Sequence, residues 1–154
     1  MHDALPPHAH VPGVNTRHPD DRFDALKASV QGVPLEELHV TAAFEAGLAW
    51  LDAGYYWESH EVLEAVWLRT PDPSPEREMV QALIQLANAR LKQRMGRPNA
   101  VRRLCGMVAD HLAACPTDRV ILGLRAKEVE DWLAETQNSK KEYYNALNWR
   151  EAAR

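Results

Sequence analysis

The chain has 154 residues, a length that suits one compact domain with a sizeable core, so folding needs neither disulfides nor a structural metal. Its formal net charge of -4 at pH 7 gives no general case for binding nucleic acid or a membrane surface. No apolar run approaches the roughly 20 residues of a membrane helix, and the start of the chain lacks a basic-then-apolar signal pattern.

The first 21 residues are rich in histidine and proline and have no hydrophobic periodicity, which predicts a flexible N-terminal arm over residues 1–21. A helical domain is expected over residues 22–135. It begins with one short helix, because Phe23, Leu26 and Val30 have helical spacing.

Residues 35–53 predict the next helix, whose apolar positions recur with helical spacing along one face. Gly54 is expected to end it as a C-terminal glycine cap. A further helix over residues 55–69 is apolar around most of its circumference, which predicts a central place in a bundle.

Three prolines make residues 70–75 a stiff connector, in which Ser74 is a good N-cap and Pro75 fits the first helical position. We therefore expect a long helix over residues 76–95. Another helix is predicted over residues 98–114.

The last main helix is predicted over residues 125–135, and the polar run 138–141 predicts a break before a short terminal helix. Residues 136–154 are thus expected to form a C-terminal extension. Since no segment predicts a strand, the expected fold is an all-α, single-domain bundle of about five main helices, with short extra helices at the ends.

The stretch 55–67 places three carboxylates and one histidine among four large aromatic residues. His60 and Glu64 stand four residues apart and are neighbours on one helical face, which we expect to point into the core. Glu61 lies at the margin of that face. Glu58 points nearly the opposite way and is expected to be solvated.

A polar stripe of Gln81, Gln85 and Asn88 runs along the helix predicted over residues 76–95. The stripe is either the solvent face of the helix or the partner of His60 and Glu64. An amide can donate to a carboxylate and serve an imidazole as donor or acceptor, so both interpretations stay open.

The two helices resemble those of the DUF309 family, which are marked by His-Glu-x-Leu-Glu-x-x-Trp after a Gly-Tyr pair, and by Gln-x-x-Ile-Gln-Leu-Ala. Here these motifs fall at His60 to Trp67 and at Gln81 to Ala87, and the resemblance covers about residues 44–133. It implies an all-α bundle and no biochemical activity.

His60, Glu61 and Glu64 form a His-Glu-x-x-Glu pattern, one letter away from that of zinc proteases. His60 and Glu64 could both bind a divalent metal, with Glu61 as the candidate catalytic base. The favoured interpretation is structural, with the imidazole hydrogen-bonded to Glu64 or an amide inside an aromatic core, and no cofactor is predicted.

Tyr56, Trp57 and Trp67 are expected to surround this pair. Trp50, with Trp57 and Trp67, suits either an aromatic ligand pocket or the core, and the core is favoured.

A cluster of basic residues flanks Gly96. It suits either an anion or RNA site or a solvated turn, and no aromatic residue interleaves it, which favours the turn. The anion-binding candidates are Arg94, Arg97, Arg102 and Arg103.

Cys105 and Cys115 stand ten residues apart on one predicted helix and point in different directions, so no disulfide is expected between them. We expect both to pack as small apolar side chains in a reducing cytoplasm. A Cys–His nucleophile that uses His111 is the alternative.

The residues support three hypotheses for function, in order of preference. The first is a non-enzymatic helical module that self-associates or binds a protein partner. The second is a metal-dependent hydrolase or oxidase, and the third is a binder of anionic ligands or RNA. The first includes a buried polar cluster made of His60, Glu61, Glu64, Gln81, Gln85 and Asn88.

Overall fold

The computed structural model describes the backbone of residues 5–152 and the side chains of residues 5–139. Within this range the fold is all-helical, as predicted, with one packed body and no strand. The elements in chain order are α1 (Asp24–Ala28), the 3-10 helix η1 (Leu35–Val40), α2 (Ala42–Ala53), α3 (Tyr56–Trp67), α4 (Pro75–Arg94), α5 (Pro98–Ala113) and α6 (Ala126–Ala152).

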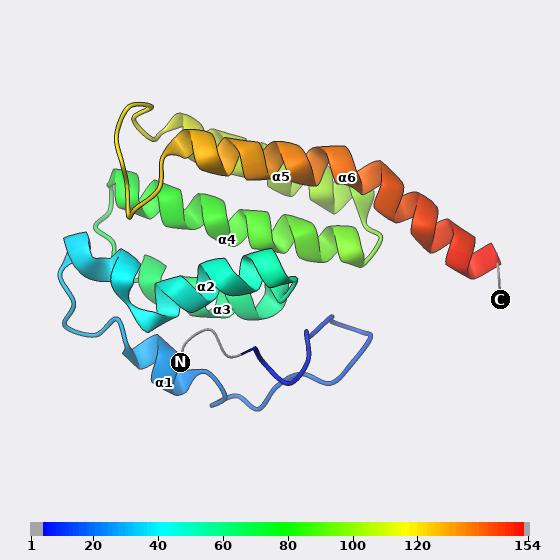
Figure 1. Cartoon of the computed structure of the whole chain (residues 1–154), viewed down its shortest axis with the longest axis horizontal. Helices are drawn as coiled ribbons and strands as arrows, with labels where there is room; N and C mark the ends of the chain where they lie inside the picture. Colours follow the sequence, from blue (N-terminus) through cyan, green and yellow to red (C-terminus); the bar gives the residue numbers. More distant parts are fainter. Residues whose placement is uncertain (1–4, 153–154) are drawn as a thin grey trace.

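Helix α4 is the centre of the bundle. It packs against α3 on one side and against α5 and α6 on the other, and α2 packs on α3 (Figure 1). Its buried side chains cover most of its circumference, and the half-buried stripe of Gln81, Gln85 and Asn88 is the main interruption. The core therefore lies on both sides of α4.

Two predicted helix ends are confirmed. The hydroxyl of Ser74 accepts a hydrogen bond from the Arg77 amide at 3.0 Å, and Pro75 is the first residue of α4. Gly54 caps α2 with a φ of 91°, a left-handed backbone conformation that glycine adopts without steric cost.

Helices α2 and α3 approach each other closely at Gly47. The Ser59 hydroxyl donates to the Gly47 carbonyl at 2.7 Å. A Cβ atom at position 47 would lie 2.5 Å from Cδ2 of Leu63, which is far too close. This contact sets the position of α3, which carries the motif residues His60 and Glu64, relative to α2.

The prediction of one helix over residues 35–53 was wrong. Thr41 has extended backbone angles (φ -75°, ψ 153°) and separates η1 from α2. Its hydroxyl donates to the Leu38 carbonyl at 2.6 Å and accepts from the Phe44 amide at 3.4 Å. Threonine favours such a cap because its hydroxyl satisfies a helix amide that otherwise has no partner.

The predicted break at residues 138–141 was also wrong, because α6 runs without interruption from Ala126 to Ala152. The run contains neither glycine nor proline, and its residues lower helix propensity by only about 0.7 kcal/mol each at most. Ser139 donates its hydroxyl to the Thr136 carbonyl at 3.2 Å, a bond that suits a helix.

Candidate functional site

The His60–Glu64 pair lies near the surface, not in the core. Nε2 of His60 is 3.2 Å from Oε1 of Glu64, and the Glu64 side chain is 50% exposed against 19% for His60. The expectation that both side chains point inward beneath aromatic cover was therefore wrong for Glu64. Helix α3 packs mainly against α2 and α4 and also contacts α1, and Glu64 lies at the margin of these contacts.

Both nitrogens of the His60 ring face acceptors. Nδ1 donates to the Trp57 carbonyl at 2.7 Å, while Nε2 faces Glu64. Burial would lower the pKa of His60, but the hydrogen bond and charge of Glu64, aided by Trp57 and Glu61, raise it overall. The hydrogen bond from His60 lowers the pKa of Glu64 despite its partial burial. The pair thus favours imidazolium and carboxylate.

Glu61, the candidate catalytic base, faces α1. Its Oε2 is 3.3 Å from Nζ of Lys27. Glu61 lines the hollow beside Lys27, whereas the amide stripe of α4 lines a different groove. The structure therefore separates Glu61 from the amides with which the sequence grouped it.

The motif residues of α3 and α4 meet in one open groove of about 370 Å³, here called the α3–α4 groove. Besides motif residues, Leu68 and Asn88 line it, and Leu68 at its edge is 72% exposed. The lining residues are Glu64, Trp67, Leu68, Gln81, Ile84, Gln85 and Asn88.

The amide stripe follows neither of the two interpretations fully. Gln81, Gln85 and Asn88 are half-buried and share the groove with Glu64, so they lie neither on an open solvent face nor in a buried cluster. Asn88 donates to Gln85 at 3.3 Å. Within residues 5–139, no hydrogen bond joins these amides to His60 or Glu64.

A smaller hollow of about 210 Å³ continues the α3–α4 groove, because Trp67 and Gln81 line both. The guanidinium of Arg77 stacks over the Trp67 ring, 3.8 Å from its centroid. At the far end, Nδ1 of His111 is 2.7 Å from Oε2 of Glu78. Polar and charged side chains therefore follow one another along the surface from α3 across α4 to α5.

The aromatic residues divide between core and surface. Trp50 is buried, while Tyr56, Trp57 and Trp67 are half-buried. Tyr56 carries the guanidinium of Arg94, 4.4 Å above its ring. Trp57 and Trp67 each have an arginine over the ring, so both face outward in part.

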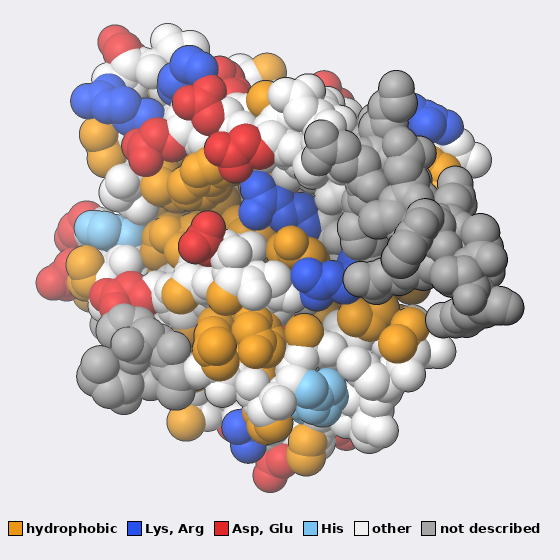
Figure 2. Space-filling model, turned by 45° about the vertical axis from the view of Figure 1, so that its right-hand side comes forward, with side chains coloured by type: hydrophobic (Ala, Val, Ile, Leu, Met, Phe, Trp, Pro, Cys, Tyr) orange, Lys and Arg blue, Asp and Glu red, His pale blue; other side chains and the backbone are white. Residues whose placement is uncertain are grey.

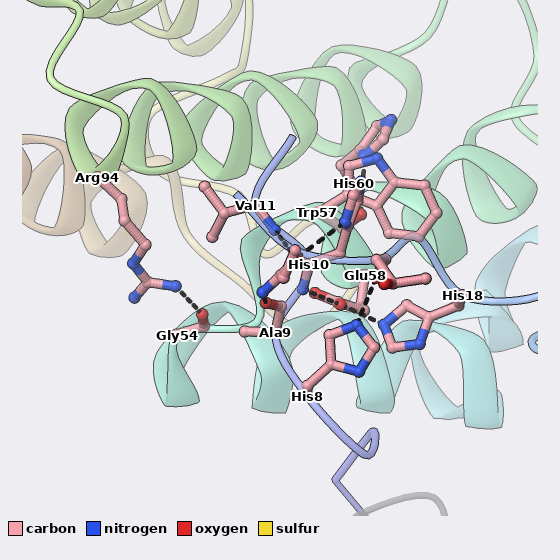
Figure 3. A network of polar contacts seen from close by, with 12 residues as sticks. His8, Ala9, His10, Val11, His18, Gly54, Trp57, Glu58, His60 and Arg94 are labelled. Atoms are coloured by element: carbon pink, nitrogen blue, oxygen red, sulfur yellow. Dashed lines mark hydrogen bonds and ion pairs between the residues drawn. The ribbon is translucent and has the colours of Figure 1, made fainter. Parts of the chain in front are cut away.

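A buried histidine–glutamate pair, His18 and Glu58, was not predicted from the sequence. Glu58, expected in solvent, is 0% exposed, and its Oε2 lies 2.6 Å from Nε2 of His18 in the N-terminal segment. The same oxygen accepts the backbone amide of His10 at 2.7 Å. Figure 3 shows His8, His10 and His18 gathered around Glu58.

This network fixes the position of part of the predicted N-terminal arm. The ring of His10 meets that of Trp57 edge-on with centroids 5.0 Å apart, and His18 packs in the same way on Phe23 at 5.4 Å. His10 and His18 are therefore buried against α3. Flexibility of residues 1–21 remains a prediction.

The solvent-exposed position predicted for Glu58 was wrong because α3 is covered on nearly all sides. A helical wheel separates opposite faces, but it cannot show that a distant segment covers the second face. The four histidines of the N-terminal segment were the one signal that could have found the pair, since a carboxylate in an aromatic helix needs a partner of that kind.

Among the described residues, no three side chains of His, Cys, Asp or Glu are placed so that they could hold a metal ion. Glu64 and His60 contact each other, and His111 contacts Glu78. The third ligand that a site at His60 and Glu64 would require is thus not supplied by the described part of the chain.

The cysteines are buried and not bonded to each other. Burial, with the negative charges of Glu78 and Glu76, raises the pKa of Cys115 to about 11. Its Sγ is 3.5 Å from the His111 backbone carbonyl. Because a nucleophilic thiol needs a lowered pKa, Cys115 does not suit the alternative Cys–His role.

Three of the four candidate anion-binding arginines, Arg94, Arg102 and Arg103, have partners within the chain. Arg94 donates to the Gly54 carbonyl at 2.6 Å, and Arg90 donates to Thr136 Oγ1 at 2.8 Å. Arg102 hydrogen-bonds to Asn99, and Arg103 reaches the sulfur of Met107 at 3.8 Å. Two of these arginines thus join helices.

Comparison with known families identifies part of the chain. Residues 44–104 match the family model described as domain of unknown function DUF309. This segment belongs to the DUF309 family. The DUF309 match contains both motif helices and ends before residue 133, the expected limit. No curated protein and no solved structure matches the chain.

The DUF309 segment contains α2 from Phe44 onward, α3, α4 and the first part of α5, and hence every residue that lines the α3–α4 groove. His10 and His18 lie outside it. No helix in the described part of the chain is long and apolar enough to cross a membrane.

Proposed function

We propose that this protein is a non-enzymatic helical module that binds a segment of a partner protein in the α3–α4 groove. The observation that carries the proposal is the convergence of Glu64 and Trp67 of one motif with Gln81 and Gln85 of the other on a single open surface. Core-building motifs would be expected to converge in the interior.

The chemistry of the α3–α4 groove suits a peptide. Side-chain amides offer both donors and acceptors, as peptide groups do, and Gln81, Gln85 and Asn88 place them along one wall. Leu68 and Ile84 supply apolar surface for a partner side chain. The lowered pKa of Glu64 keeps its carboxylate charged at neutral pH.

We therefore expect a partner segment that carries an apolar residue beside a basic one. The apolar residue would cover Leu68, and the basic residue would pair with Glu64. Such pairing across a groove rim contributes mainly to specificity and to the rate of association.

Selection from a displayed peptide library tests this proposal, with the full chain as bait. We expect selected peptides to combine apolar and basic residues and to bind Leu68→Asp at least tenfold more weakly. Val40→Asp is the matched control, since Val40 is also an exposed aliphatic residue but does not line the groove.

Two results would count against the proposal. One is a failure to select any peptide that binds the full chain. The other is equal loss of binding in Leu68→Asp and Val40→Asp, with unchanged thermal stability, which would place the binding surface elsewhere.

A further inference from the structure

A second groove, of about 520 Å³, lies between α2 and α6 and is here called the α2–α6 groove. Its wall is mainly apolar, and its acidic residues lie one on each helix. The lining includes Leu48, Ala49, Asp52, Leu124, Trp132 and Glu135. Figure 2 shows hydrophobic side chains that remain uncovered in the middle of one face of the molecule.

Helix α6 continues well past the bundle. Near the end of α4, Gln93 donates to the Thr136 carbonyl at 3.0 Å, which places Thr136 level with the last turn of α4. Helix α6 extends to Ala152, 16 residues further (152 - 136), or about 24 Å at 1.5 Å per residue. Figure 1 shows this end projecting beyond the other helices.

The sequence of the projecting end is apolar at positions that continue the lining of the α2–α6 groove. A helix turns by about 100° per residue, so positions 143 and 147 fall about 20° and 60° from position 132. These positions hold Tyr143 and Leu147, and position 132 is Trp132 of the groove. An isolated helix of this length is marginally stable in water unless its apolar side is covered.

We propose that a second copy of this chain provides that cover. The projecting end of α6 in each copy lies along the α2–α6 groove of the other, in a two-fold symmetric dimer. The balance of charge also favours this arrangement: residues 140–152 contain three Lys and Arg against two Glu, and the groove carries Asp52 and Glu135 against one basic residue, Arg90.

The size of the contact is sufficient for a dimer. Half the surface of a helix about 20 Å long and 10 Å wide is on the order of 300 Å², and the groove buries a similar area. Two symmetric contacts therefore bury about 1,200 Å², which is the lower limit for specific, stable interfaces.

Sedimentation velocity of the full chain from about 5 to 200 µM, a range that brackets moderate dimer affinities, tests the proposal. We expect a dimer, and a monomer for the chain that ends at Ser139. Ala49→Arg should weaken association at least tenfold, because it places a bulky basic side chain in the α2–α6 groove, where the basic end of the partner helix would dock. Ala109→Arg is the matched control, since Ala109 is also exposed and lies on α5, and should leave the dimer intact.

A full chain that stays monomeric at 200 µM would overturn the proposal. So would a dimer that survives truncation after Ser139, or equal effects of Ala49→Arg and Ala109→Arg. Circular dichroism shows whether the variants fold, and the truncation gives an independent result if Ala49→Arg does not. The α2–α6 groove is separate from the α3–α4 groove, so either proposal can fail without the other.

Discussion

Two histidine–glutamate pairs use the same helix, α3, in opposite ways. His60 and Glu64 are four residues apart, lie within the family motifs and sit half in solvent. His18 and Glu58 are 40 residues apart, and their side chains are 2% and 0% exposed. The spacing of four residues thus made the surface pair visible in the sequence. The interior pair was not visible there, because its two residues come from distant segments.

The difference in burial indicates what each pair contributes to the protein. A pair at the edge of a groove can meet a ligand, and its free energy contribution is small because water screens it. A buried pair connects segments, and losing one partner leaves a polar group without compensation. The exposure of Glu64 suits the recognition role proposed for it, and the buried His18–Glu58 pair holds the N-terminal segment against α3.

The largest expected effect belongs to Glu58. Glu58→Ala leaves the buried imidazole of His18 and the amide of His10 without their acceptor, and should lower the free energy of unfolding by about 3 kcal/mol. Urea denaturation measures this loss. A change below about 1 kcal/mol would show that the pair does not lie in the interior.

A second prediction concerns the amide of His10, which donates to Glu58 at 2.7 Å. Its hydrogen exchange should speed up at least tenfold in Glu58→Ala, because the segment opens locally without global unfolding. The amide of Ser59 in α3, which donates to the carbonyl of the N-cap residue Tyr55, serves as the internal control. Equal acceleration at both amides would indicate loss of the whole bundle instead.

The surface pair should respond to pH in a defined window. The raised pKa of His60 gives stability that is present below the pKa of an unfolded histidine and is lost as pH rises through the folded value. The lowered pKa of Glu64 gives stability that is present above the pKa of an unfolded glutamate and is lost as pH falls. The contribution is thus greatest between about pH 4.3 and 6.5.

An NMR titration of the His60 ring checks this window. Its pKa should lie above that of an exposed histidine and should fall in Glu64→Gln, which keeps the shape of the side chain but removes its charge. A His60 pKa that does not respond to Glu64→Gln would remove the basis for the assigned ion pair.

The smallest effect belongs to Glu64. Since its side chain is 50% exposed, Glu64→Ala should cost no more than about 0.5 kcal/mol in urea denaturation while it weakens peptide binding. A loss comparable to that of Glu58→Ala would erase the contrast between the two pairs.

Much of the fold was predictable because its signals are local. The periodicity of α4, the Ser74 cap and the Gly54 cap each depend on residues within one or two turns. The helix predictions were wrong at Thr41 and at residues 138–141, where local preferences for or against a helix are weak. At such positions the hydrogen bonds of Thr41 and Ser139 decide whether the helix is interrupted.

The candidate site was predictable in part of its membership and not in its environment. His60 and Glu61 of the predicted polar cluster do not line the α3–α4 groove. Glu64, Trp67, Gln81 and Gln85 were singled out from the motifs, and they do share one surface. Whether that surface is core or groove depends on how far α3 and α4 are covered by other segments, and no pattern within either helix contains that information.

The helical bundle and the ends of most of its helices could be predicted from the amino-acid sequence alone. So could the unusual polar and charged side chains on two of the helices. These properties follow from spacing along the backbone. Only the tertiary structure decided that Glu58 is buried and Glu64 is not, because burial depends on contacts between segments far apart in the chain, such as His18 against α3.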